Sequence, residues 1–437
     1  MPNKKDKKSK KAAANEGNKA IKLQSVFFEG KPYSMKLDEF HMPRAAVKLL
    51  KHLQSLIGHC TENGFPEWKE IDVKSAIGEY CADEVVELGD RYNRVAKPFA
   101  ATWTGSYNTD NLGDWGNIHC SDVVASEITM LAYEMAVPRP TALNKHYRLW
   151  TEETYGETNL MQMASILDEA NITKKDVFVD LGCGVGQLVM FTSAFAQCKK
   201  CVGIELSDFP FSCAEKLEGH FKDLMKFFGK RYSKFELHHG DILDPKYRDL
   251  LMNEATVIFI NNLLFPDNLM LRIKSEILQG LKPGVRIITT KKLGDLKKKS
   301  INYRSINDIT SMSDTVMLTS MQEGVSWTCT PVPFYLTTMN PAKLQQYYER
   351  RQSEVEAAEA AAAARRGKKR RTTSANTSTT SSKSEVAEIK EEIEEDEEEE
   401  EDVVKYEDVS HIKLEDVSVD LDSEDVPDPE DVENKPS

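Results

Sequence analysis

The chain has 437 residues, 40% of them hydrophobic, so it is long enough for two or three domains and apolar enough for at least one buried core. No apolar run approaches the roughly 18 residues of a membrane span, and the Lys-rich N-terminus lacks the apolar stretch of a signal peptide. We therefore expect a soluble intracellular protein with no membrane contact. The net charge of −14 is unevenly distributed, because a mildly acidic middle lies between two basic segments and precedes a strongly acidic tail.

The N-terminal third is predicted to contain a basic arm followed by a helical lobe. Residues 1–22 carry eight Lys against two acidic residues and have almost nothing to bury, which predicts a disordered arm. Helical patterns such as the one over 45–53 follow, with a Gly- and Trp-rich loop over 103–115 and a further helix near 121–137. These segments together predict a helical N-terminal lobe over 23–145.

From Val177 onward, short β-branched runs alternate with gaps that are mostly long enough for a helix. This alternation predicts a doubly wound α/β sheet with a central parallel block, in a domain that we place at 146–345. Two later runs, 316–319 and 334–338, are candidates for closing antiparallel strands. The five parallel strands are expected at 177–181, 201–205, 235–239, 257–261 and 286–290.

The C-terminal part of the chain is predicted to be one helix followed by a disordered tail. A helix is expected over 341–364, and a segment with seven basic residues and no acidic residue follows at 365–383. We therefore assign 346–371 to a helix with a basic end, and 372–437 to a disordered linker and tail. Within 384–437 there are 25 acidic residues against four basic ones.

A glycine-rich loop after the first of these strands is the main candidate for a cofactor site. Gly182, Gly184 and Gly186 allow a tight turn and bring backbone N–H groups close to a ligand. Their G-x-G-x-G spacing differs from the G-x-G-x-x-G of dinucleotide-binding proteins, since Gln187 stands where that pattern has its last glycine. Asp180 also precedes the loop. An S-adenosylmethionine site has no pyrophosphate to accommodate, so this spacing suits it better.

Two acidic residues at the ends of the next two strands support the same cofactor. Glu205 follows Gly182 by 23 residues, where a carboxylate can accept both ribose hydroxyl protons. Asp241 follows the third strand and can receive the adenine amino group, while Ile242 can face the ring. The alternative is a glycine turn with two unrelated surface acids, and three correctly spaced sites at consecutive strand ends favour S-adenosylmethionine over it.

The eight cysteines are scattered, which favours reduced core residues over a disulfide framework. Cys198 and Cys201 form the only CxxC pair. Because no second pair or nearby His motif accompanies them, we expect no metal site.

With these motifs in place, the chain resembles the disruptor-of-telomeric-silencing family, the histone lysine methyltransferases that lack a SET domain. The resemblance implies a class I methyltransferase (Rossmann-like) fold with a helical N-terminal lobe and disordered tails. It also implies a nuclear enzyme that modifies a lysine in the globular core of histone H3. The matching stretches are Tyr155–Thr158, Phe178–Gln187, Val202–Glu205, Gly240–Leu243, Val257–Asn262, Val325–Thr328 and Pro331–Leu336.

The resemblance also assigns roles to individual residues. Asn261 would lie between the methionine part of the cofactor and the lysine, and Trp327 would wall the lysine channel together with Phe334. The family has an aromatic residue where this chain has Leu263 and a Tyr where it has Phe334, and both changes touch the lysine channel. The residues expected to hold the cofactor are Tyr155, Gly156, Glu157, Thr158, Phe178, Val179, Asp180, Leu181, Gly182, Cys183, Gly184, Val185, Gly186, Gln187, Glu205, Asp241 and Ile242.

The charged segments indicate a nucleosome as partner. Arg365–Arg371 and residues 1–22 can neutralise DNA phosphates, and the first of these also has the composition of a nuclear localisation signal. By resemblance, Arg304 lies in a loop that reaches the acidic face of the histones. The acidic tail is expected to engage chromatin or transcription complexes.

Two other functions remain open from the sequence. A class I methyltransferase could act on another protein substrate, although the absence of a Pro-Pro-aromatic motif after the fourth strand argues against nucleobase amines. Alternatively, a chromatin-binding module could keep the cofactor fold with weak or no catalysis, as the changes at Leu263 and Phe334 would allow.

Overall fold

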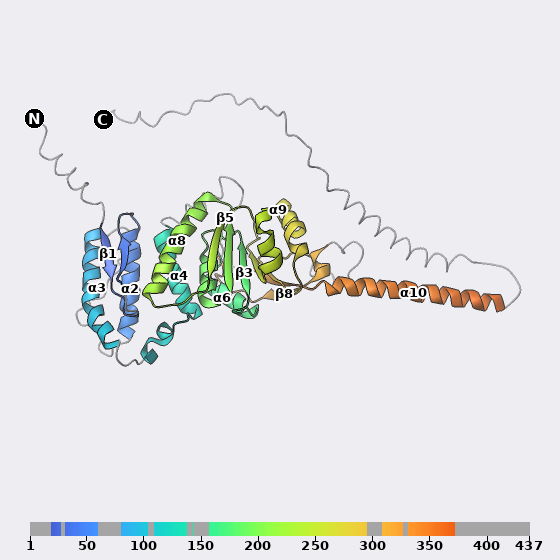
Figure 1. Ribbon diagram of the computed structural model, residues 1–437, viewed down its shortest axis with the longest axis horizontal. Coiled ribbons are helices and arrows are strands. Elements are labelled where there is room, and N and C mark those ends of the chain that lie inside the picture. The colour runs from blue at the N-terminus through green and yellow to red at the C-terminus, as the bar shows by residue number, and fades with distance from the viewer. Residues whose placement is uncertain are drawn as a thin grey trace, which may run out of the picture. The chain divides into compact units, whose positions relative to one another are not determined.

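The computed structural model describes residues 19–27, 31–59, 80–103, 109–137, 143, 157–294, 308–326 and 331–371 (Figure 1). The chain divides into two compact units, Met1–Tyr347 and Tyr348–Ser437. The second unit contains, within the described residues, only the greater part of helix α10 (Ala342–Arg371). That helix extends beyond the predicted end at residue 364.

A seven-stranded sheet organises the first unit, with the order β5-β4-β3-β6-β7-β9-β8. The first five strands of that order are parallel, and β9 pairs antiparallel with both β7 and β8. This is the predicted doubly wound sheet with a parallel centre and two closing antiparallel strands. The strands are β3 (Val177–Leu181), β4 (Lys200–Glu205), β5 (Phe235–His239), β6 (Val257–Ile260), β7 (Arg286–Thr289), β8 (Ser313–Leu318) and β9 (Phe334–Met339).

The central strands are buried on both faces, which explains why they are continuous apolar runs in the sequence. Phe178 and Phe259 belong to the core on one face of the sheet, and Val179 and Ile258 belong to the core on the other. Fully burying such side chains stabilises the fold by roughly 1.5–3 kcal/mol each. On the first face lie α6 (Leu160–Glu169), α7 (Gln187–Phe195) and α8 (Asp208–Phe227), and on the second α9 (Asp267–Arg272) with the short helices Pro245–Tyr247, Leu250–Glu254, Ile273–Ile277 and Leu278–Gly280. A further short helix, Ile309–Met312, precedes β8.

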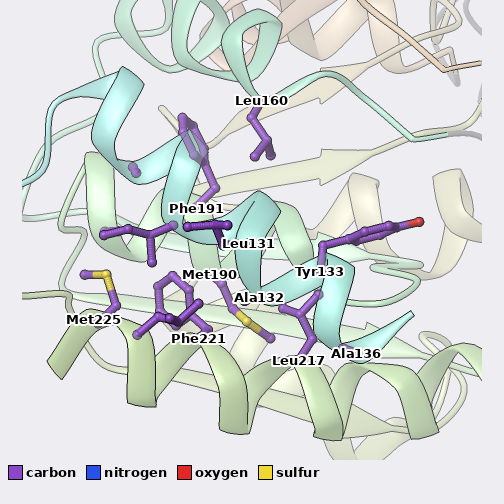
Figure 2. Packing of buried hydrophobic residues seen from close by; sticks show 14 of the residues in the cluster. Leu131, Ala132, Tyr133, Ala136, Leu160, Met190, Phe191, Leu217, Phe221 and Met225 are labelled. Atoms are coloured by element: carbon purple, nitrogen blue, oxygen red, sulfur yellow. The ribbon is translucent and has the colours of Figure 1, made fainter. Parts of the chain in front are cut away.

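Helix α4 (Asp122–Ala136) packs across α7 and α8 as a further layer. The Ser121 side chain caps its N-terminus by accepting the N–H of Val124. In Figure 2 its inner side chains meet the row from Leu217 to Met225 on α8, whereas the Tyr133 hydroxyl points away from this cluster. Helix α4 falls within the predicted N-terminal lobe, yet it packs on α7 and α8, the helices that lie on the first face of the sheet.

The predicted helical lobe also contains a small sheet. Helices α2 (Met42–His59) and α3 (Ala82–Trp103) and the 3₁₀ segment η1 (Thr109–Gly116) are accompanied by antiparallel strands β1 (Ala20–Leu23) and β2 (Tyr33–Lys36). A Cβ on Gly89 would lie 2.5 Å from Ile21, so this glycine lets β1 approach α3. The predicted end of the disordered arm, at residue 22, was therefore too far along the chain, because residues 20–22 already form part of β1.

The amino edge of the sheet is held by one partly buried ion pair. Arg286 at the start of β7 pairs with Asp176, just before β3, and also donates to the carbonyls of Ala170 (2.6 Å) and Asn171 (2.9 Å). The Thr256 hydroxyl donates to the same carboxylate at 2.8 Å. This network ties together the beginnings of β3, β6 and β7. In the part of the chain that the structure describes, no helix has both the length and the apolarity to cross a bilayer.

Candidate active site

The candidate site lies where four parallel strands end side by side. Strands β3, β4, β5 and β6 are neighbours in the sheet, so the segments after them meet at its carboxyl edge. The chain leaves β3 for α7 on one face, and the segment after β6 leads to α9 on the other. Such a topological switch point is where doubly wound sheets bind ligands.

The glycine loop adopts the backbone conformation that its sequence predicts. Gly182, Gly184 and Gly186 have φ values of +83°, +56° and +76°, a region that disfavours residues with a Cβ. The N–H groups of Gly182 and Cys183 donate to the Ile204 carbonyl at 2.9 and 3.0 Å, which fixes the loop against β4. Gly186 then caps α7, and no side chain occupies that cap. The loop is thus a rigid cradle beside a helix N-terminus.

Glu205 is held at the end of β4 by backbone donors. Its Oε2 accepts the Gly184 N–H and its Oε1 accepts the Ser207 N–H, both at 2.8 Å. The side chain is buried, and Gly240, after β5, donates to its backbone carbonyl at 2.9 Å. The structure therefore brings this carboxylate into direct contact with the glycine loop, in a position suited to accepting hydroxyl protons of a ribose.

Asp180 is the second buried acid of the site. Burial, and then the Glu205 carboxylate, raise the pKa of Asp180 to about 8. Two carboxyl groups in one buried place favour the binding of a positively charged ligand. Among the described residues, no three His, Cys, Asp or Glu side chains are grouped so that they could hold a metal ion.

His239 joins the ends of β4 and β5 and was missed by the sequence analysis. Its Nε2 lies 2.9 Å from the Leu206 carbonyl and 3.2 Å from Asp208 Oδ1. Since both neighbours are acceptors, Nε2 carries the hydrogen. The ring also stacks on Phe211, with 4.9 Å between ring centroids. His239 at the end of β5 therefore holds the turn that follows Glu205 at the end of β4.

Asp241 and Ile242 follow directly after this clamp. Asp241 is exposed and its Oδ1 accepts the Leu243 N–H at 2.9 Å, whereas Ile242 is buried in the second core. Both lie at the predicted edge of the sheet. Their roles toward adenine remain predictions.

The structure places two predicted motifs beside each other. Thr158 forms an antiparallel bridge with Val325. The Ser326 N–H donates to the Glu157 carbonyl at 2.8 Å, and the Glu157 N–H donates to the Ser326 hydroxyl at 2.9 Å. The Tyr133 hydroxyl donates to Glu157 Oε1 at 2.7 Å; burial, and then Glu157, raise the pKa of Tyr133 far above its usual range, so it stays a donor. A segment that precedes β3 is thus joined to one that precedes β9.

Asn261 is half-buried immediately after β6, and the Thr290 hydroxyl donates to its Oδ1 at 3.0 Å. Phe334 is fully buried in the first core, and Leu263 packs against the same cluster. The structure therefore shows Phe334 as a core residue at the start of β9. Its predicted place in the wall of a lysine channel remains a prediction.

The remaining predicted residues divide into described and undescribed groups. All of the following are buried in β3, in the loop after it or at the start of α7: Phe178, Val179, Leu181, Cys183, Val185 and Gln187. Tyr155, Gly156, Trp327 and Arg304 lie outside the described residues, as do residues 1–18 of the basic arm. Arg365–Arg371 form the last turns of α10.

Three observations fit S-adenosylmethionine as the ligand of this edge. The glycine loop exposes backbone with no Cβ in the way of a ligand, and Glu205 supplies a buried carboxylate. The buried Thr158 hydroxyl, in the segment that bridges to Val325, has no hydrogen-bond partner among the described residues and is able to bond a ligand atom. A cationic ligand would also compensate the two buried acids.

Comparison with known proteins agrees with this description. Residues 133–339 match the family model described as "Histone methylation protein DOT1". The chain is 49% identical over 336 residues to a histone-lysine N-methyltransferase of Caenorhabditis elegans described as H3 lysine-79 specific. The aligned region covers 76% of this chain and 35% of that protein. The Drosophila melanogaster protein of the same description is 31% identical over 279 residues, covering 64% of this chain and 15% of that protein.

The chain thus spans about a third or less of the length of these two relatives. Among solved structures, an RNA methyltransferase from Salinibacter ruber in complex with S-adenosyl-L-homocysteine aligns with 41% of this chain and 90% of its own, at 18% identity and a TM-score of 0.27. A TM-score this low carries no argument, and the fold rests on the strand order described above.

Proposed function

We propose that the chain is a member of the DOT1 family of histone methylation proteins and that it transfers a methyl group from S-adenosylmethionine to a lysine in the globular core of nucleosomal histone H3. The relatives are described as specific for lysine-79 of H3, and we propose the same lysine as the acceptor here.

The observation that carries this proposal is the contact between the buried Glu205 carboxylate and the N–H of Gly184 in the glycine loop. It joins the two sequence features that most specifically indicate the cofactor, on adjacent strands of a doubly wound sheet. The bridge between Thr158 and Val325 supports the proposal independently, because it brings a cofactor motif next to the motif that contains Trp327.

The bound cofactor supplies an electrophilic methyl group on a sulfonium. In our proposal Glu205 accepts the ribose hydroxyls, Asp241 faces the adenine amino group, and ionised Asp180 faces the positively charged methionine part. Asn261 orients the reacting groups by hydrogen bonding. The chain would need no nucleophile of its own, because the cofactor would supply a methyl group that an aligned, neutral lysine amine can accept.

The amine must be uncharged to attack, although free lysine has a pKa of about 10.4. An apolar channel lined by Trp327 and Phe334 would favour the neutral amine by desolvation, and the lysine would release its proton before entering. A cationic sulfonium also interacts favourably with aromatic faces.

We propose the nucleosome as the partner and the nucleus as the place of action. Residues 1–22 and Arg365–Arg371 would neutralise DNA phosphates, Arg304 would reach the acidic face of the histones, and the acidic tail would contact chromatin or transcription complexes. The basic segments support this, because a lysine in the histone core is accessible only to an enzyme that binds the whole particle.

The test is transfer of radiolabelled methyl groups by the full chain onto reconstituted nucleosomes. We expect labelling of H3 in nucleosomes, little labelling of free H3 or of a peptide, and none when lysine-79 of H3 is replaced by arginine. Gly184→Arg should abolish transfer because it places a bulky side chain in the cofactor cradle at positive φ, whereas Gly219→Arg on the open surface of α8 should not.

Cofactor binding without transfer to nucleosomes would contradict the proposal and favour a chromatin-binding module. Equal labelling of a bare peptide would contradict the proposed requirement for the nucleosome. Labelling that persists after the lysine replacement would point to another acceptor.

A further inference from the structure

A buried asparagine joins the ends of β6 and β7 beside the candidate site. Asn262 is 1% exposed, and its Oδ1 accepts the N–H groups of Thr290 at 3.1 Å and Lys291 at 2.8 Å. Its Nδ2 donates to the Lys291 carbonyl at 3.1 Å. The amide thus bonds the backbone of residues 290–291 as a neighbouring strand would, and it fixes Thr290 relative to the segment after β6.

The hydroxyl of Thr290 has two acceptors within reach but only one hydrogen. Asn261 Oδ1 lies at 3.0 Å and Asn262 Oδ1 at 3.3 Å. An amide oxygen has two lone pairs, and both of those on Asn262 Oδ1 are used by the two backbone N–H groups. The hydroxyl therefore donates to Asn261, which is also the shorter of the two contacts.

This bond holds the Oδ1 side of the Asn261 amide toward Thr290. Because Oδ1 turns toward Thr290, the Nδ2 donors on the opposite corner of the planar amide turn away from β7. Thr290 is β-branched and almost fully buried, and its backbone is held by Asn262, so packing opposes the side-chain rotation that would turn the hydroxyl away from Asn261.

We propose that Thr290 is a positioning residue for methyl transfer, and that its hydroxyl sets the direction in which Asn261 presents its amide donors to the reacting groups. This inference rests on the proposed function and adds a residue that does not itself touch the cofactor or the lysine. Asn262 contributes by holding Thr290 in place.

The neighbouring threonine provides a matched control. Thr289 is the last residue of β7, directly before Thr290, and it is also fully buried, but its hydroxyl has no hydrogen-bond partner among the described residues. Thr289→Val therefore removes a buried hydroxyl without removing an interaction, whereas Thr290→Val removes one that points at Asn261. Thr290→Ser keeps the hydroxyl and removes only a methyl group.

The experiment compares these variants of the full chain in steady-state transfer onto nucleosomes, with the Kd for S-adenosylhomocysteine and the melting temperature measured alongside. Thr290→Val should lower kcat about tenfold, the effect of one lost positioning hydrogen bond, with the Kd unchanged. Thr290→Ser should return kcat to within about threefold of wild type, and Thr289→Val should not change it.

A double-mutant comparison separates positioning from a general loss of stability. If Thr290 acts through Asn261, then Thr290→Val should have no further effect on kcat in an Asn261→Ala background. A tenfold loss in that background too, or wild-type kcat for Thr290→Val alone, would overturn the inference. Absence of transfer by wild-type protein would instead refute the proposed function, and the inference with it.

Discussion

The raised pKa of Asp180 makes cofactor binding depend on pH in a defined direction. The carboxyl is protonated below about pH 8 in the cofactor-free protein, because burial and the neighbouring Glu205 disfavour its charge. If the positively charged methionine part of the cofactor binds next to ionised Asp180, binding must release that proton. Affinity should therefore rise with pH up to about 8 and then level off.

The size of the effect follows from the same pKa. With a pKa of about 8, roughly 0.9 proton is bound at pH 7 and released on binding, and the affinity for S-adenosylmethionine should increase about 50-fold from pH 6 to pH 8. Isothermal titration calorimetry in buffers with different ionisation enthalpies measures both quantities.

Asp180→Asn is the matched control, since it keeps the shape of the side chain but cannot titrate. This variant should bind more weakly and show a flat pH profile over the same range. A variant that retains the wild-type pH dependence would refute the assignment to Asp180, and a wild-type protein that releases no proton at pH 7 would refute the electrostatic reasoning altogether.

Three further predictions concern one contact at the candidate site and two charged groups elsewhere in the fold. His239→Ala should weaken S-adenosylhomocysteine binding about three- to tenfold because the Leu206 carbonyl loses its donor, and an unchanged Kd would show that the clamp is irrelevant to the site. Arg286→Leu should lower the unfolding free energy in urea by about 3 kcal/mol, because it leaves the Asp176 carboxylate buried and unpaired; adding Asp176→Leu should recover part of this loss, and failure to do so would contradict the ion-pair argument. Burial lowers the pKa of Lys230 to about 8, so the folded state loses this proton before the unfolded state does as pH rises, and stability relative to Lys230→Met should increase by about 1.5 kcal/mol between pH 8 and pH 9.5. Equal pH profiles of unfolding for the two proteins would contradict that sign.

Much of the sheet could be predicted because its physics is local. Strands buried on both faces need apolar, β-branched runs such as Val177–Leu181 and Val257–Ile260, so both appear directly in the sequence. The glycine loop was equally predictable, because three left-handed backbone positions require glycine at that spacing. The order of the strands, in contrast, is visible only in the folded chain.

The small N-terminal sheet and the packing of α4 were not predicted. Residues 20–23 and 33–36 are too short to stand out from their Lys-rich surroundings, and β1 is stabilised by contact with α3 more than 60 residues away. The buried face of α4 predicts a helix but does not say which helices cover it, and only the folded chain places it on α7 and α8.

The candidate site divides in the same way. The sequence by itself predicted the kind of cofactor, since Gly182, Gly184, Gly186 and Glu205 combine backbone conformation with charge at strand ends, and its motifs carry the resemblance to the family. Only the tertiary structure decided how the site is held. His239 from β5 bonds the turn after β4, and Thr290 contacts Asn261 across 29 positions of the chain. Such hydrogen bonds depend on which strands become neighbours, and that is settled by burial of the whole sheet rather than by any short pattern of residues.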